Sequence, residues 1–338
     1  MSNQYNLPLH KYEKDGIYVG KKPVTHKGKQ SAEVYAEAAT AFLEQQKDAD
    51  KPFFAYVSFQ TPHDPRTSPE EYHDMYDLER IELPPSYKPE HPFDNGMLKI
   101  RDENLAGFPR KKAEVKKHIA DFYATITHTD AQIGRILEAL EATGKAGNTI
   151  IVFTADNGLA VGKHGLMGKQ NVYDHSVHVP FIICGPDIPE NETRDQLMYI
   201  YDIYPTLCDL AGLPTPDEVE YQSLSPIIKD KKAEAREHLY FAFMNWQRGI
   251  RDEQFKLIEY CVNGERHTQL FDLKKDPHEI SNLAGDKQHA ETLSSLRELL
   301  KKERVRLNDG NTPWEFTNTQ GTEFWNTYES VKESAVPE

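Results

Sequence analysis

The chain has 338 residues and a formal net charge of −14, with 38% hydrophobic and 28% charged residues. This composition is typical of a globular protein with enough material for one large α/β domain or two smaller ones. The negative charge argues against nucleic acid as a partner, because neutralising phosphates needs clustered lysine and arginine. No stretch approaches the length and hydrophobicity of a membrane span. The one basic cluster, RKKAEVKK at 110–117, is interpreted as a solvated helix face, with a polyanion contact as the minority alternative.

The three cysteines, Cys184, Cys208 and Cys261, are far apart and have no metal-ligand spacing. Cys184 and Cys208 lie inside apolar runs, so we expect both to be small core residues. Met1 leads into a polar stretch without the apolar segment of a signal peptide, and the sequence leaves the localisation open.

The predicted elements alternate between helices and apolar strands in the first two thirds of the chain. A helical pattern begins at Ser31, a long amphipathic helix spans about 119–140 and ends at Gly144, and a further helix covers 202–211. Three unbroken apolar runs are predicted as buried strands: 53–59, 149–155 and 179–184. Residues 66–110 are rich in proline and predict a long excursion with short helices.

The pattern changes after a proline-rich stretch at 214–226. HLYFAF, GIRDEQFKLIEY and HTQLFDL predict a small antiparallel sheet, and 289–307 predicts an amphipathic helix that packs on it. The sequence therefore predicts an α/β fold with a mainly parallel central sheet flanked by helices, and a small C-terminal antiparallel sheet with a helix. The predicted division is an α/β domain over 1–213 and a smaller C-terminal α+β subdomain with a tail over 214–338.

Polar groups concentrate in FTADNGLAVGKHGLMGKQNVYDHSVHVP, residues 153–180. Asp156 and Asn157 follow a predicted strand, where ligands bind in open α/β sheets, and offer hard oxygen donors suited to Ca²⁺ or Mg²⁺. His164 and Lys169 could bind an anion. Taken singly, Asp-Asn-Gly is usually a turn, a histidine usually a hydrogen-bonding residue and a lysine usually solvated. The order of the whole array favours a functional site.

The array resembles the sulfatase family of the alkaline phosphatase superfamily, whose pattern is close to F-T-x-D-N-G, G-x-H-G, K, Y-E/D and V-P. FFAYVSFQTPHDP, YDIYPTLCDLAGL and TQLFDLKKDPHEISNLAG are similar to further segments of that family. The resemblance extends over about residues 30 to 300. It implies an alkaline phosphatase-like fold and hydrolysis of sulfate esters, most often on sulfated sugars.

The resemblance also implies roles for single residues. Asp156 and Asn157 match calcium ligands, Lys169 matches a lysine that contacts sulfate, and His63 matches a histidine at sulfate or the leaving oxygen. His164 is expected at the rim of the substrate site and His178 in its wall, although many relatives carry arginine at the position of His178. Complete relatives use Ca²⁺ or Mg²⁺ with a formylglycine nucleophile, and are often exported or periplasmic.

The sequence departs from the family pattern at the nucleophile. No cysteine or serine begins the C-x-P/S/A-x-R motif that carries formylglycine, and the chain contains no Asp-Asp dipeptide. We therefore expect the C-terminal part of a sulfatase, inactive alone and a weak calcium binder. A phosphate or phosphonate ester hydrolase of the same superfamily and a non-catalytic anion-binding protein are the alternatives. The expected partner is a sulfated small molecule or glycan, and the oligomeric state stays open. His63 and Lys169 are expected to converge on one pocket.

Overall fold

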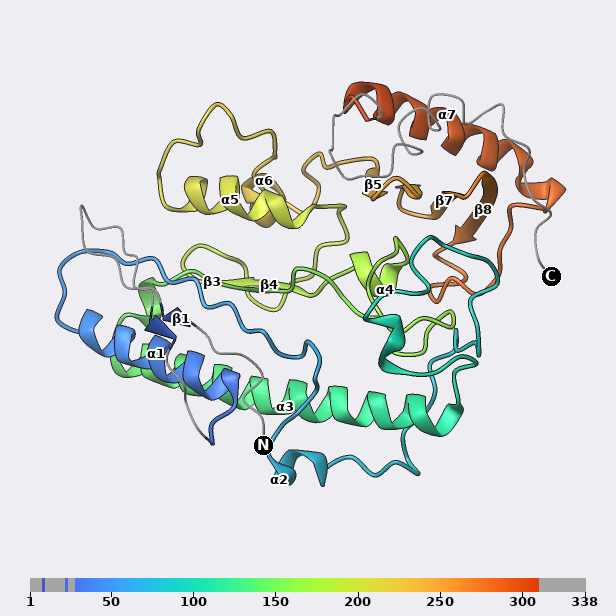
Figure 1. Cartoon of the computed structure of the whole chain (residues 1–338). Helices are drawn as coiled ribbons and strands as arrows, with labels where there is room; N and C mark the ends of the chain where they lie inside the picture. Colours follow the sequence, from blue (N-terminus) through green and yellow to red (C-terminus); the bar gives the residue numbers. More distant parts are fainter. Residues whose placement is uncertain (1–7, 10–21, 24–27, 310–338) are drawn as a thin grey trace. The chain divides into compact units, whose positions relative to one another are not determined.

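The computed structural model describes residues 8–9, 22–23 and 28–309 (Figure 1). The chain divides into two compact units, one comprising Met1–Leu83 with Lys112–Ile150 and the other Pro84–Lys111 with Ile151–Glu338. The domain boundary that the sequence predicts at residue 213 does not coincide with a boundary between these two units, and it stays a prediction. Among the described residues, no helix is long and apolar enough to cross a membrane.

The first unit is built around two long helices that pack against each other. Small buried residues on both helices, such as Ala36 and Ala124, allow their backbones to approach closely. Gly144 has φ +76° and donates its N–H to the carbonyl of Glu141, which ends the long helix at the predicted place. The elements of this unit are β1 (Pro8–Leu9), β2 (Lys22–Pro23), α1 (Ser31–Gln46), α2 (Glu70–His73), α3 (Lys112–Ala142) and the 3₁₀ turn η2 (Ala146–Asn148).

The apolar run 53–59 forms no strand, contrary to the prediction. Phe53 and Phe59 make edge contacts with aromatic rings of α1. Phe54 and Tyr56, in the same run, are 75% and 83% exposed. An apolar run indicates that a segment prefers burial, but strand formation also needs a neighbouring backbone to pair with.

The two remaining predicted strands exist but are shorter and run antiparallel. β3 (Ile151–Thr154) pairs with β4 (Phe181–Cys184), with Ile151 opposite Cys184. The prediction that the three runs are central strands of one parallel sheet is therefore wrong for the described residues, because an unbroken apolar pattern does not determine the direction of pairing. Cys184, expected in the core, is exposed at the end of β4, whereas Cys208 is buried as expected.

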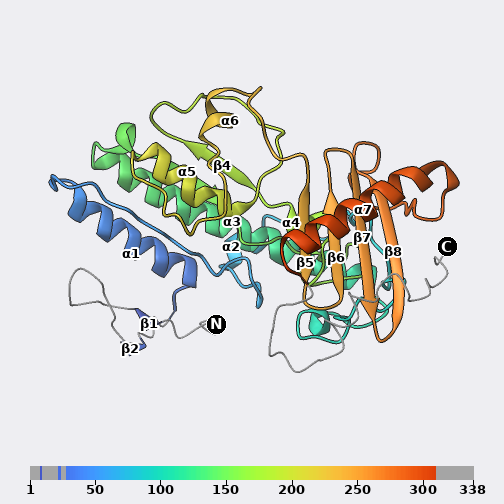
Figure 2. The ribbon, with the colours of Figure 1, turned by 90° about the horizontal axis from the view of Figure 1, so that it is seen from above.

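The C-terminal antiparallel sheet and its helix are confirmed. Four strands follow one another in the order β5 (Leu239–Phe243), β6 (Gln247–Arg251), β7 (Phe255–Val262) and β8 (Glu265–Asp272), and the run GIRDEQFKLIEY contributes to two of them. Figures 1 and 2 show α7 (Ala290–Arg306) lying over these strands. The remaining elements of the second unit are the 3₁₀ turns η1 (Glu103–Leu105), η3 (Ile200–Asp202) and η4 (Lys287–His289), and the helices α4 (Asp174–Val177), α5 (Ile203–Leu210) and α6 (Ser225–Lys229).

The two faces of this sheet pack against different parts of the chain. Side chains alternate along a strand, so Leu257 faces α7 while its neighbour Ile258 faces the other way. On that second face, Ile258 packs against Val172 and Tyr173 of the conspicuous segment at 153–180. One face of the C-terminal sheet therefore packs against the segment 153–180, which contains the candidate site.

Candidate active site

The Asp-Asn-Gly turn lies directly against the backbone of α4. Gly158 donates its N–H to the carbonyl of Ser176 at 2.9 Å. A Cβ at position 158 would stand 2.0 Å from the carbonyl oxygen of His175, so only glycine fits there. Asp156 is exposed and accepts the N–H of Asn157 at 2.9 Å, while Asn157 is half-buried. The turn is thereby held by the main chain, which leaves the exposed Asp156 side chain at the surface.

A narrow loop follows and leads to Lys169. Its two sides are joined by main-chain hydrogen bonds from Ala160 to Gly168 at 2.9 Å and from Gly162 to Leu166 at 2.7 Å. The Lys169 side chain is half-buried, and its ammonium has no hydrogen-bond or ion-pair partner among residues 28–309. The Lys169 ammonium is therefore available to bind an anion from solution.

His164 is a buried ring in a stack of aromatic side chains. It is 5% exposed and lies 4.1 Å from the ring of Tyr173, centroid to centroid, with the planes 4° apart. Burial, together with the nearby His91 and Lys88, lowers the pKa of His164 to about 3, so the ring is neutral at ordinary pH. His164 belongs to the wall of a small pocket, which it shares with Tyr173 and Glu279. It does not stand at an exposed rim, and its part in substrate binding stays a prediction.

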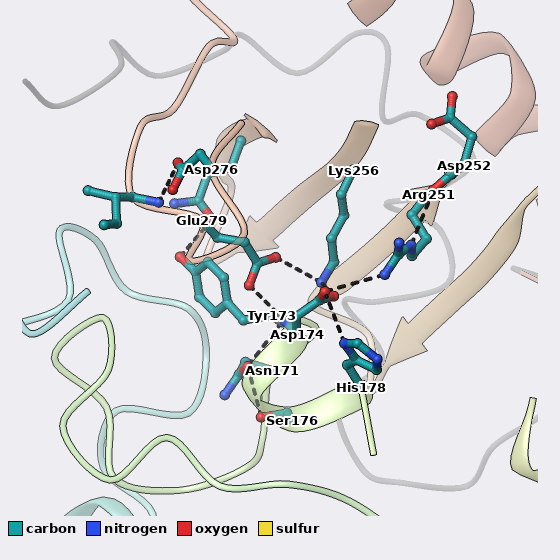
Figure 3. A network of polar contacts seen from close by, with 12 residues as sticks. Asn171, Tyr173, Asp174, Ser176, His178, Arg251, Asp252, Lys256, Asp276 and Glu279 are labelled. Carbon is teal, nitrogen blue, oxygen red and sulfur yellow. Dashed lines mark hydrogen bonds and ion pairs between the residues drawn. The ribbon is translucent and has the colours of Figure 1, made fainter. Parts of the chain in front are cut away.

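A buried ion-pair network fixes α4, the element after Lys169 (Figure 3). Lys256 of β7 is fully buried and lies 2.7 Å from Asp174 and 2.8 Å from Glu279. Glu279 also accepts the N–H of Asp174 at 2.7 Å. Burial alone would raise the pKa of the Asp174 carboxyl, but Lys256 and Arg251 hold it below its ordinary value. Because a buried cation must remain paired, this network ties α4 firmly to the C-terminal sheet.

His178 stands at the end of the same network. Its Nδ1 lies 3.7 Å from Asp174, and its side chain is 74% exposed. Figure 3 shows the His178 ring beside the Asp174 carboxylate. The structure thus places His178 on the surface immediately after α4 instead of inside a wall, and its contact with substrate stays a prediction.

His63 belongs to the other compact unit. Its Nδ1 is 2.9 Å from the carbonyl oxygen of Asp64 and 3.3 Å from the Asp64 carboxylate, and about one third of its side chain is exposed. This contact orients the ring within its loop. The convergence of His63 with Lys169 stays a prediction.

The two predicted metal ligands lie side by side. Asp156 and Asn157 are adjacent in sequence and offer hard oxygen atoms, which is the donor chemistry that Ca²⁺ and Mg²⁺ prefer. In the described part of the chain, no group of three or more His, Cys, Asp or Glu side chains could hold a metal ion. The residues therefore fit a part of a calcium site.

Sequence analysis missed two buried residues that hold the Lys169 loop, Glu103 and Arg110. The sequence predicts Arg110 on a solvated helix face, but it is 1% exposed and precedes α3, which begins at Lys112. Its guanidinium contacts the carboxylate of Glu103 and donates to the carbonyl of Gly165 at 3.1 Å. No sequence signal identified this pair, because both residues lie in a segment without periodicity.

Comparisons with known proteins first define the fold. A protein solved in complex with its substrate D-glucosamine-2-N,6-O-disulfate superposes with a TM-score of 0.71 at 24% identity, over 91% of this chain and 75% of that one. The phosphonate monoester hydrolase of Agrobacterium radiobacter superposes with a TM-score of 0.69 at 27% identity, over 80% of this chain and 60% of that one. The predicted alkaline phosphatase-like α/β class is thereby confirmed.

The family follows from the sequence comparisons. The model of the sulfatase family matches residues 2–213, and that of the C-terminal part of N-sulphoglucosamine sulphohydrolase matches residues 162–306. The arylsulfatase of Clostridium perfringens is 34% identical, covering 79% of this chain and 56% of the relative. The N-acetylglucosamine-6-O-sulfatase of Bacteroides thetaiotaomicron is 30% identical, covering 64% and 40%.

This chain belongs to the sulfatase family, as its motifs predict. At family level these proteins are sulfuric ester hydrolases. The chain spans about half the length of the curated relatives it matches.

Proposed function

We propose that this chain carries the sulfate-binding part of a sulfatase active site and serves the hydrolysis of sulfate esters on a carbohydrate. The observation that supports the proposal most is the Lys169 ammonium, half-buried and without a partner among the described residues. A cation with no partner among the described residues is free to bind an anion from solution, and a sulfate group carries the matching charge. The names of the glucosamine-directed relatives support a sulfated amino sugar as the substrate class.

The chemistry explains why these residue types are needed. Negative charge develops on the leaving oxygen as the sulfate group is transferred, so a fixed cation at Lys169 and a proton donor at His63 would lower the barrier. Asp156 and Asn157 would hold part of a Ca²⁺ or Mg²⁺ site, and the ion would polarise the sulfate when bound. A formylglycine would supply the attacking group, and this sequence contains no motif that matches it.

Binding tests the proposal directly. We expect N-acetylglucosamine 6-sulfate, titrated into the chain and followed by NMR, to bind more tightly than unsulfated N-acetylglucosamine. Lys169→Ala should weaken binding of the sulfated sugar at least about tenfold, because it removes a charge-assisted contact. The exposed Lys274, whose ammonium lies 3.6 Å from Glu253, provides the control Lys274→Ala, which removes the same charge elsewhere. Equal affinity in the Lys169→Ala variant and the wild-type chain would refute the proposal.

Activity provides a second test. We expect the purified 338-residue chain to show no turnover of aryl or sugar sulfates, since it has no nucleophile motif. Measurable turnover that Lys169→Ala abolishes would contradict this expectation.

A phosphate or phosphonate ester hydrolase is the second candidate, supported by the likeness to the phosphonate monoester hydrolase. The two candidates differ in the ester they bind. Preferential binding of a sugar phosphate over the matching sugar sulfate would favour the second.

A further inference from the structure

The proline-rich excursion contributes a buried ion pair to the loop that carries Lys169. Glu103 and Arg110 are 3% and 1% exposed, and their side chains are in direct contact. Arg110 also donates to the main-chain carbonyls of Glu103 at 2.7 Å and of Gly165 at 3.1 Å, and to that of Ala106. The guanidinium therefore joins the excursion to the loop and orients the Glu103 carboxylate.

The Glu103 carboxylate receives two successive N–H groups of the loop. Its Oε2 accepts from Met167 at 2.9 Å and its Oε1 accepts from Gly168 at 2.8 Å. These are the two residues immediately before Lys169. Hydrogen bonds to a buried carboxylate are stronger than neutral ones, so they fix the backbone direction with which the chain enters Lys169.

The residue after Lys169 is held from the same segment. The side-chain amide of Gln170 donates from Nε2 to the carboxylate of Asp102 at 2.8 Å, and its Oε1 accepts the main-chain N–H of Lys169 at 2.9 Å. Asp102 and Glu103 are consecutive, so one short stretch of the excursion holds both sides of Lys169. The Lys169 main chain is restrained on both sides, although its ammonium has no partner among the described residues.

Stability alone is a poor reason for this arrangement. Replacing a buried ion pair by well-packed apolar side chains is often neutral or stabilising, because desolvation of the two charges offsets their attraction. The Glu103–Arg110 ion pair instead fixes the geometry of the backbone next to Lys169. A ligand that meets a pre-oriented group loses less conformational entropy on binding.

We propose that Glu103, held by Arg110, is a positioning residue for the Lys169 ammonium and thereby sets the affinity of this chain for a sulfate group. Gln170, held by Asp102, acts in the same way from the other side. The inference rests on the proposed function of Lys169. It concerns residues that make no contact with the sulfate themselves.

The test compares Glu103→Gln with a buried carboxylate elsewhere in the same unit. Asp202 is fully buried, pairs with Arg236 and accepts main-chain N–H groups, so Asp202→Asn is a matched control for loss of a buried charge. In Glu103→Gln, one carboxylate oxygen becomes an NH₂ group that cannot accept an N–H. Binding of N-acetylglucosamine 6-sulfate should weaken about tenfold in Glu103→Gln, as expected for loss of pre-orientation, and stay unchanged in Asp202→Asn.

Deuterium exchange supplies a readout that does not depend on the ligand. The amides of Met167 and Gly168 should exchange faster in Glu103→Gln and at the wild-type rate in Asp202→Asn. If Glu103→Gln fails to fold, Gln170→Ala carries the same binding expectation, since it removes the acceptor of the Lys169 N–H at a half-buried position.

The outcomes separate the two proposals. Weaker binding in Lys169→Ala with unchanged binding in Glu103→Gln would overturn the positioning role alone. Unchanged exchange at Met167 and Gly168 in Glu103→Gln would overturn it as well. Binding that does not depend on Lys169 would refute the proposed function and this inference together.

Discussion

Acid should destabilise this protein through histidines that are buried in the neutral form. His164 is 5% exposed, and burial, with His91 and Lys88 nearby, lowers its pKa to about 3. His91 is 6% exposed, and burial lowers its pKa to about 4 although the carbonyl of Phe93 opposes the shift. Both rings titrate with a pKa near 6.5 once the chain unfolds, as does any solvated histidine.

The pH dependence of the free energy of unfolding follows from the difference in proton binding between the folded and unfolded chain. The folded pKa is depressed for a base, so the stability is fully present above pH 6.5 and is lost as the pH falls below that value. At pH 5 each unfolded histidine has taken up about one proton that its folded counterpart has not, which costs about 2 kcal/mol per ring. Together His164 and His91 should remove about 4 kcal/mol between pH 7.5 and pH 5, a large share of the stability of an ordinary domain.

Urea unfolding at a series of pH values, followed by circular dichroism, measures this loss. His164→Phe keeps a ring against Tyr173 but cannot take up a proton, so the pH slope near pH 5 should fall by about 1.4 kcal/mol per pH unit. Leu166→Ala is the control, because it removes a buried side chain from the same loop without removing a titrating group. If His164→Phe and the wild-type chain show the same pH dependence, the assignment of a neutral buried His164 is wrong.

Three further outcomes are expected. Lys256→Met should cost on the order of 3–5 kcal/mol in urea unfolding, because it leaves the buried Glu279 carboxylate without its cation and removes one of the cations at Asp174. Lys274→Met at an exposed pair should cost under about 1 kcal/mol, and similar losses in both would contradict the role of the network. Gly158→Ala should cost about 1–3 kcal/mol through collision with the His175 carbonyl, and Gly147→Ala, which meets nothing within 4 Å, should be nearly neutral. Calorimetry should show no tight calcium binding, since Asp156 and Asn157 supply a minority of the six to eight or so oxygen ligands that the ion takes, and sub-micromolar affinity would refute this view.

The C-terminal sheet and helix could be predicted because their signals are local. Alternating polar and apolar residues, turns between short strands, and leucines spaced along 289–307 each specify their own element, as in β8 and α7. The segment 153–180 could be recognised for a similar reason, because Gly158 and the residues around it occur in a fixed order. Order along the chain is information that a sequence contains directly.

The antiparallel direction of β3 and β4 and the exposure of Phe54 and Tyr56 could not be predicted. An apolar run states that a segment prefers burial, but which backbone lies beside it depends on the rest of the fold. The same limit applies to Cys184, which ends an apolar run and is nevertheless exposed.

The restraints on Lys169 were decided by tertiary structure alone. Glu103 and Lys256 are charged residues, and solvation is the ordinary expectation for both. Lys256 is buried because Asp174 reaches it from a distant segment, and Glu103 is buried because it pairs with the nearby Arg110 and receives the N–H groups of the distant Met167 and Gly168. Sequence alone therefore indicated which residues could bind sulfate, whereas the folded chain decided which residues hold them in place, since burial of a charge depends on partners brought together by folding.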